Sequence, residues 1–83
     1  MNQIELRQEV QTAIAAEWPR FAEQHPALAA VLDQTVLVET ATSRLAEDPE
    51  FQAVLRNAQA TGKMINVVTM WVSEFIARWL PTL

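Results

Sequence analysis

Few side chains in this sequence have the chemistry of a catalyst, and their spacing does not bring them together. The single histidine, His25, precedes a proline in a predicted turn, and no second imidazole or positioned carboxylate accompanies it at a ligand spacing. The two serines, Ser43 and Ser73, lie outside the glycine-rich or strand-to-helix settings that expose a nucleophile. We interpret His25 as a capping or exposed turn residue, and the sequence predicts that the protein is not an enzyme.

Metal and cofactor chemistry is equally unsupported. Glu47, Asp48 and Glu50 cluster, but no Glu-x-x-His motif or EF-hand spacing goes with them, and we interpret them as the charge pattern of a helix start. The chain contains no cysteine, which excludes a disulfide framework, a thiolate zinc site and a cysteine nucleophile. One glycine cannot build a phosphate-cradling loop. We expect no metal and no cofactor.

The charge balance argues against nucleic acid as a partner. The 83 residues carry a formal charge of −4, with nine acids and four bases among residues 1–56 and no basic stripe anywhere. The first residues lack the layout of a signal peptide. The longest uncharged run, residues 64–73, is about half the length that a bilayer span needs. We therefore expect a cytoplasmic protein that binds neither nucleic acid nor, in the favoured interpretation, a membrane.

Length and composition predict one small helical domain covering residues 1–83. The chain has a mass of 9.4 kDa and is 51% apolar, which is too rich for a disordered protein. A chain of this size buries roughly 60–65% of its unfolded surface, so the core is thin. The remaining stability is expected to come from efficient helix packing or from self-association.

The first predicted helix begins at Asn2, which has Glu5 three residues later in the spacing of a capping box. Pro19 either ends the helix or kinks it, because proline lacks an amide donor and collides with the carbonyl four residues back. Phe21 stays in phase with the apolar stripe, which favours a kink or a short following turn of helix. The stripe consists of Leu6, Val10, Ile14, Trp18 and Phe21.

The second predicted helix begins at His25-Pro26. Its apolar positions follow a heptad, which outweighs the β-branched content of residues 35–40 and predicts helix there. Glu39 lies beside this seam and is interpreted as a charge that bridges to a neighbouring helix, with a buried, tuned acid as the alternative. The seam positions are Leu28, Val31, Thr35, Val38, Thr42 and Leu45.

The third predicted helix begins at Asp48-Pro49, an N-cap followed by proline at the first helical position. Gly62 either ends this helix as a C-cap or lies inside it. The unbroken period favours one continuous helix from Pro49 to Leu80, which would be about 48 Å long. The heptad positions are Phe51, Ala58, Ile65, Val72 and Trp79, with Val54, Thr61, Val68 and Phe75 between them.

The segment Met64–Leu80 carries more apolar surface than one stripe requires, since 12 of its 17 residues are apolar. A helix that is apolar on several sides contacts more than one partner, and two short helices are not expected to surround it. The alternative is that the first helix covers the additional surface. The predicted partner-binding residues are Met64, Val67, Met70, Trp71, Phe75 and Trp79.

These patterns predict an all-α fold, a small antiparallel bundle of three or four helices with a long C-terminal helix, completed by self-association. The predicted function is a non-catalytic protein-interaction or assembly module that forms a homo-oligomer through its C-terminal helix. A small regulator or inhibitor that binds another protein belongs to the same interpretation. The alternative is a peripheral membrane or apolar-ligand binding protein that uses Met64–Leu80. No motif resembles a specific family.

Overall fold

The computed structural model describes residues 2–62 and 64–83, and the side chains of all of these except Met64, Ile65 and Asn66. Its elements are α1 (Gln3–Gln24), α2 (Pro26–Val31), α3 (Gln34–Glu47), α4 (Pro49–Thr61), α5 (Met64–Trp79) and a final 3₁₀ turn, η1 (Leu80–Thr82). No strand occurs among the described residues. The predicted all-α class is confirmed, and residues 35–40 are helical within α3 despite their β-branched side chains.

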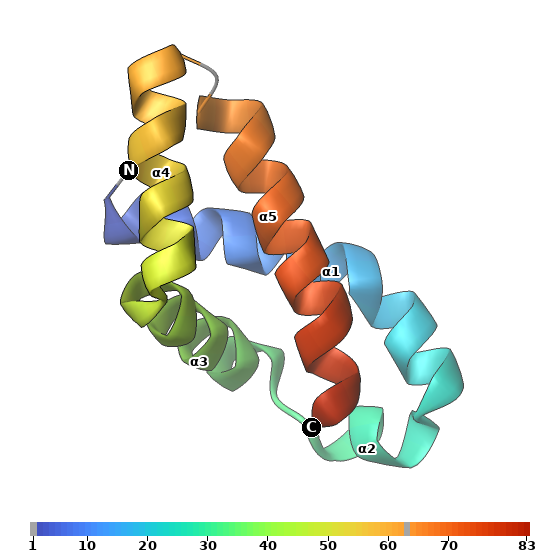
Figure 1. Cartoon of the computed structure of the whole chain (residues 1–83). Helices are drawn as coiled ribbons and strands as arrows, with labels where there is room; N and C mark the ends of the chain where they lie inside the picture. Colours follow the sequence, from blue (N-terminus) through green and yellow to red (C-terminus); the bar gives the residue numbers. More distant parts are fainter. Residues whose placement is uncertain (1, 63) are drawn as a thin grey trace.

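The predicted long C-terminal helix is wrong, because the chain turns back at Gly62. This glycine has φ 72° and ψ 12°, the left-handed conformation that commonly ends helices, and its N–H donates to the carbonyl of Ala58. In Figure 1, α4 runs upward to this turn and α5 runs downward from it. An unbroken apolar period therefore does not require an unbroken helix, and α4 covers part of α5.

The second predicted helix is also divided. Leu32 and Asp33 have extended backbones between α2 and α3, and the Asp33 carboxylate accepts the N–H of Thr35 at 2.9 Å as the N-cap of α3. Val31, a predicted seam residue, is 78% exposed, and Thr35 is exposed as well. The described chain has five α-helices, so the prediction of three or four is wrong. The additional helices arise because the chain is divided at Leu32–Asp33 and again at Gly62.

The first helix begins as predicted, with Asn2 Oδ1 accepting the N–H of Glu5 at 2.8 Å. It continues through Pro19 and ends at Gln24, so proline does not terminate it. Figure 1 shows its second half running in a different direction from its first half. Four stripe residues are buried and Trp18 is half-buried against the core.

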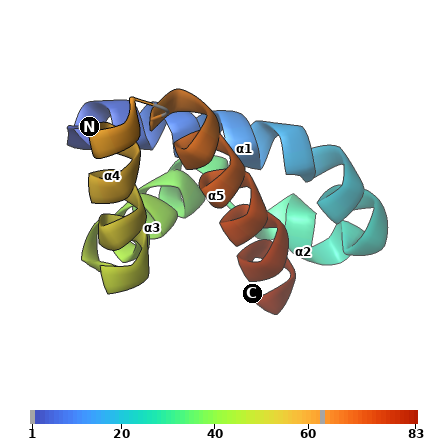
Figure 2. The ribbon, with the colours of Figure 1, turned by 45° about the horizontal axis from the view of Figure 1, so that its top comes forward.

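One elongated core joins these helices. Helix α1 packs against α3 and α5, and α4 packs against α5. Figure 2 shows α1 crossing one side of the molecule, with α3, α4 and α5 on the other. The Cα radius of gyration is 13.1 Å and the extents are 43 × 18 × 18 Å, against a radius near 12 Å for a compact chain of this length. The largest fully buried side chains are Phe51, Ile14, Leu45, Ile76, Leu80, Val10, Val68 and Val72.

Candidate interaction surface

The inner and outer sides of α5 differ sharply in burial. Val68, Val72 and Ile76 point into the core and are fully buried. Val67 and Met70 lie on the opposite side, 37% and 64% exposed. Because residues three and four apart share a helix face, Val67, Met70 and Trp71 form one cluster, which we name the outer face of α5.

Trp71 lies at the edge of the outer face and is half-buried. Its ring packs against Phe51 of α4, with the ring centroids 6.4 Å apart and the planes at 34°. Its indole Nε1 is buried and has no hydrogen-bond acceptor among the described residues. Helix α4 therefore covers part of Trp71, because the hairpin at Gly62 brings α4 against α5. Helix α1, which the alternative interpretation invoked, also packs against α5.

The remaining predicted partner-binding residues differ in exposure. Phe75 is half-buried and its ring stacks on that of Trp79, with centroids 5.9 Å apart and an interplanar angle of 16°. Trp79 is 9% exposed and belongs to the core. The side chain of Met64 lies outside the described residues. Of the five whose side chains are described, Val67 and Met70 are therefore the exposed members, with Trp71 and Phe75 at the margin.

The outer face lies on a helix without net charge. Glu74 and Arg78 are the charged residues of α5, both exposed, and the Nε of Arg78 donates to the main-chain carbonyl of Glu74 at 3.3 Å. Residues 1–56, by contrast, hold nine of the ten acids and four of the six bases. The net negative charge of the molecule therefore lies in residues 1–56 rather than in α5.

Other exposed apolar side chains lie singly on other elements. Val36 on α3 is 58% exposed and was not among the predicted surface residues. The helical period could have identified it, because Val36 lies about 200° round the helix from the buried Val38. Ile4, Val31 and Leu83 are exposed near helix or chain ends. Isolated exposed apolar residues are ordinary on soluble proteins. The outer face of α5 differs because two such residues, one turn apart, adjoin a tryptophan.

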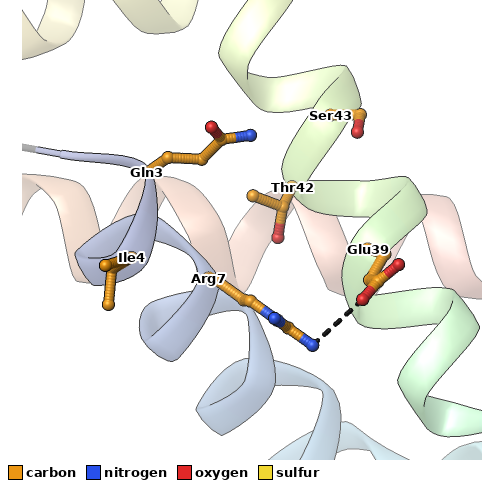
Figure 3. A pocket seen from close by; sticks show the side chains of 6 residues that line it. All are labelled: Gln3, Ile4, Arg7, Glu39, Thr42 and Ser43. Carbon is orange, nitrogen blue, oxygen red and sulfur yellow. Dashed lines mark hydrogen bonds and ion pairs between the residues drawn. The ribbon is translucent and has the colours of Figure 1, made fainter.

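A groove of about 310 Å³ lies between α1 and α3, and Figure 3 shows its lining side chains. An ion pair spans it, with Arg7 Nη2 3.1 Å from Glu39 Oε1. Both side chains are more than half exposed, so Glu39 bridges two helices as predicted and is not a buried acid. Each charge is satisfied by the other. The lining residues are Gln3, Ile4, Arg7, Glu39, Thr42 and Ser43.

The remaining chemical candidates have structural roles. His25 joins α1 to α2: its N–H donates to the carbonyl of Phe21, and its half-buried ring lies 5.3 Å from the Phe21 ring. This confirms its interpretation as a capping residue of a turn. Asp48 accepts the N–H groups of Glu50 and Phe51 at 2.9 and 3.4 Å, which confirms the predicted helix start. The described residues contain no cluster of three metal-ligand side chains.

Within the described chain, no helix has the length and apolarity to cross a membrane. Comparison with known proteins gives no relative either: no family model, no curated protein and no solved structure matches this chain. The outer face of α5 is therefore the feature from which a function can be argued.

Proposed function

We propose that this protein is a non-catalytic interaction module that associates with a second copy of itself through the outer face of α5. The observation that carries the proposal is the exposure of Val67 and Met70, one turn apart and beside Trp71, on a helix whose opposite side is core. Methionine and tryptophan are enriched at the centres of protein interfaces. Apolar clusters of this kind are commonly covered by a partner.

Electrostatics favours a second copy meeting at this face. Two molecules that each carry a charge of −4 repel one another, and the excess of acids responsible lies in residues 1–56. The outer face of α5 avoids this because Glu74 and Arg78 offset each other on that helix. The proposal keeps the predicted cytoplasmic location, where a module of this kind would meet other copies or a different protein.

The expected association is weak. A 16-residue helix is about 24 Å long, and one face of it is much smaller than the roughly 800 Å² per partner of a standard stable interface. We therefore expect a dimer that dissociates on dilution. Binding of a different protein through the same face, as a small regulator would do, is the other form of the proposal.

The test is sedimentation velocity of the purified chain over a hundredfold range of concentration. Met70→Glu and Val67→Glu are expected to shift the wild-type monomer–dimer equilibrium to monomer, because they place a charge on the outer face. Val36→Glu is the matched control: it introduces the same charge at a similarly exposed valine on α3 and is expected to leave the dimer intact. Circular dichroism should show equal helicity in all four proteins.

A wild-type chain that stays monomeric throughout would overturn self-association, and an equal effect of Val36→Glu would overturn the assignment to α5. Co-sedimentation with anionic vesicles, lost in Met70→Glu but not in Val36→Glu, would instead support the peripheral-membrane alternative. That outcome would replace the present proposal. It is not the expected one, because a membrane-binding helix normally carries several basic residues along its polar face, which α5 does not.

A further inference from the structure

The apolar heptad pattern of the C-terminal third continues in one register across the turn at Gly62, although a helical hairpin does not need a common register. Phe51 and Ala58 before Gly62, and Val72 and Trp79 after it, occupy the same heptad position and are all buried. In a helical hairpin each arm needs an apolar side facing the other, but the two arms need not share one register across the turn. A shared register is what a single continuous helix requires.

The turn itself depends on one residue. Gly62 holds the left-handed conformation at φ 72°, and a Cβ built on it would meet no atom within 4 Å. Gly62 is therefore not packed against the rest of the described chain. The turn is maintained by the ease with which glycine adopts this conformation, which other residues reach only at a cost.

We propose that the hairpin opens at Gly62 into one continuous helix and that two copies then exchange α5. In such a dimer each α5 docks against α1 and α4 of the other copy. The contacts that now join α5 to its own chain, such as the Phe51–Trp71 ring contact and the Thr69 hydroxyl donating to Glu9 at 3.1 Å, would form between the copies. The exchange keeps the native core contacts and changes the backbone mainly at the hinge.

Geometry explains why opening requires a second copy. Phe51 and Trp71 are 20 positions apart, so a continuous helix would place them about 30 Å apart, whereas their rings now lie 6.4 Å apart. An opened chain therefore loses the α4–α5 contact and exposes Val68 and Val72. Another copy with the same vacant surface restores the burial. This exchange uses the contacts that α5 makes with α1 and α4, including the Phe51 contact of Trp71, and does not rest on the outer-face association proposed above.

Gly62→Ala is the variant that tests the hinge. Alanine is favoured over glycine within a helix by a factor of about five per chain, and disfavoured in the left-handed conformation. The two hinges of a dimer should therefore tighten the exchanged dimer by at least about 25-fold. Gly62→Asn is the matched control, because asparagine tolerates the left-handed conformation best among the other residues. It should leave the dimerisation constant within a few-fold of wild type.

Distance measurement identifies the exchange. The chain has no cysteine, so spin labels can be attached to cysteines introduced at the exposed Glu50 and Glu74. Labelled chains are diluted into unlabelled chains before association, so that the distance within one chain is observed. Monomers should give the short distance of two helices packed side by side. Dimers of Gly62→Ala should give about 36 Å, the length of 24 helical residues.

The outcomes separate the two proposals. Gly62→Ala dimers that persist when Met70→Glu is added, with the long distance, support the exchange, whereas dimers that keep the short distance overturn it. A folded Gly62→Ala chain that stays monomeric also overturns it. If Gly62→Ala fails to fold, it is replaced by a wild-type chain with three additional residues, each glycine or serine, inserted after Gly62. The lengthened chain should lose any exchanged dimer that concentrated wild type forms on heating and cooling, and an unchanged dimer fraction overturns the proposal.

Discussion

The two turns that divide the predicted helices, at Leu32–Asp33 and at Gly62, interrupt similar heptad patterns with different results. At the first turn the pattern fails: Val31 is 78% exposed, and α2 contains no buried residue. At the second turn the pattern persists, since Ala58 before it and Val68 after it are both buried. The first turn separates a peripheral helix from the core, and the second folds two core helices onto each other.

This difference teaches what a heptad repeat can and cannot predict. The repeat identifies side chains that need burial, but it does not specify whether a second segment of the same chain or another copy provides the burial. At Asp33 a capping carboxylate stabilises the start of a new helix and the backbone before it is extended. At Gly62 the backbone reverses through a left-handed glycine, and the Thr61 hydroxyl before it donates to the carbonyls of Asn57 and Ala58 in the last turn of α4.

The largest difference in unfolding free energy is expected between two Val→Ala substitutions, one in each heptad pattern. Val72→Ala removes two methyl groups from a fully buried side chain and should lower the free energy of unfolding by about 2 kcal/mol or more, from lost burial and the cavity left behind. Val31→Ala should change it by less than about 0.5 kcal/mol, because that side chain is exposed and alanine is a better helix former. Urea denaturation measures both. Equal losses would mean that Val31 is buried in solution and that the first turn differs from the structure.

A smaller effect is expected at the caps that start α3 and α4. Asp33→Ala and Asp48→Ala should each cost about 0.5–2 kcal/mol, because each leaves helix N–H groups without a partner. The loss should be larger for Asp48, which accepts two N–H groups, than for Asp33, which accepts one. Denaturation with Glu47→Ala as a neighbouring control checks this. The reverse order would indicate that the start of α3 depends on its cap more than the start of α4 does.

The smallest effect is expected in the groove between α1 and α3. The Arg7–Glu39 pair is more than half exposed, and a double-mutant cycle with alanine at both positions should give a coupling of less than about 1 kcal/mol. The coupling should decrease further at high salt. A coupling of several kcal/mol would show that this ion pair, rather than the buried side chains, holds α1 against α3.

Much of the fold follows from local sequence chemistry. Asn2 and Asp48 cap helices as predicted, because a short polar side chain accepts the N–H groups two or three residues onward. The helical state of residues 35–40 follows from period, since no neighbouring segment offers a strand to pair with. The turn at Asp33 was not predicted, and the C-cap at Gly62 was the less favoured of two alternatives, because an unbroken apolar period favours a continuous helix at both places.

The candidate surface was only partly predictable. A helical wheel separates Val67 and Met70 from Val72, and the structure places them on opposite sides of α5. The wheel also groups Trp79 with the buried Val72, although Trp79 was assigned to the partner surface. It could not place α4 over Trp71, because that contact depends on where the chain reverses. The hairpin reduces the apolar surface left for a partner from most of the C-terminal helix to its outer face.

Backbone and indole NMR of the wild-type chain across a hundredfold dilution tests the proposed role of the outer face most directly. The chain contains three tryptophans, so each indole N–H can be followed separately. The account predicts concentration-dependent shifts at the amides of Val67 and Met70 and at the indole of Trp71, with none at Val36 on α3 or Trp18 on α1. Shifts confined to other elements, or no shift at the outer face of α5 over the whole range, would contradict it.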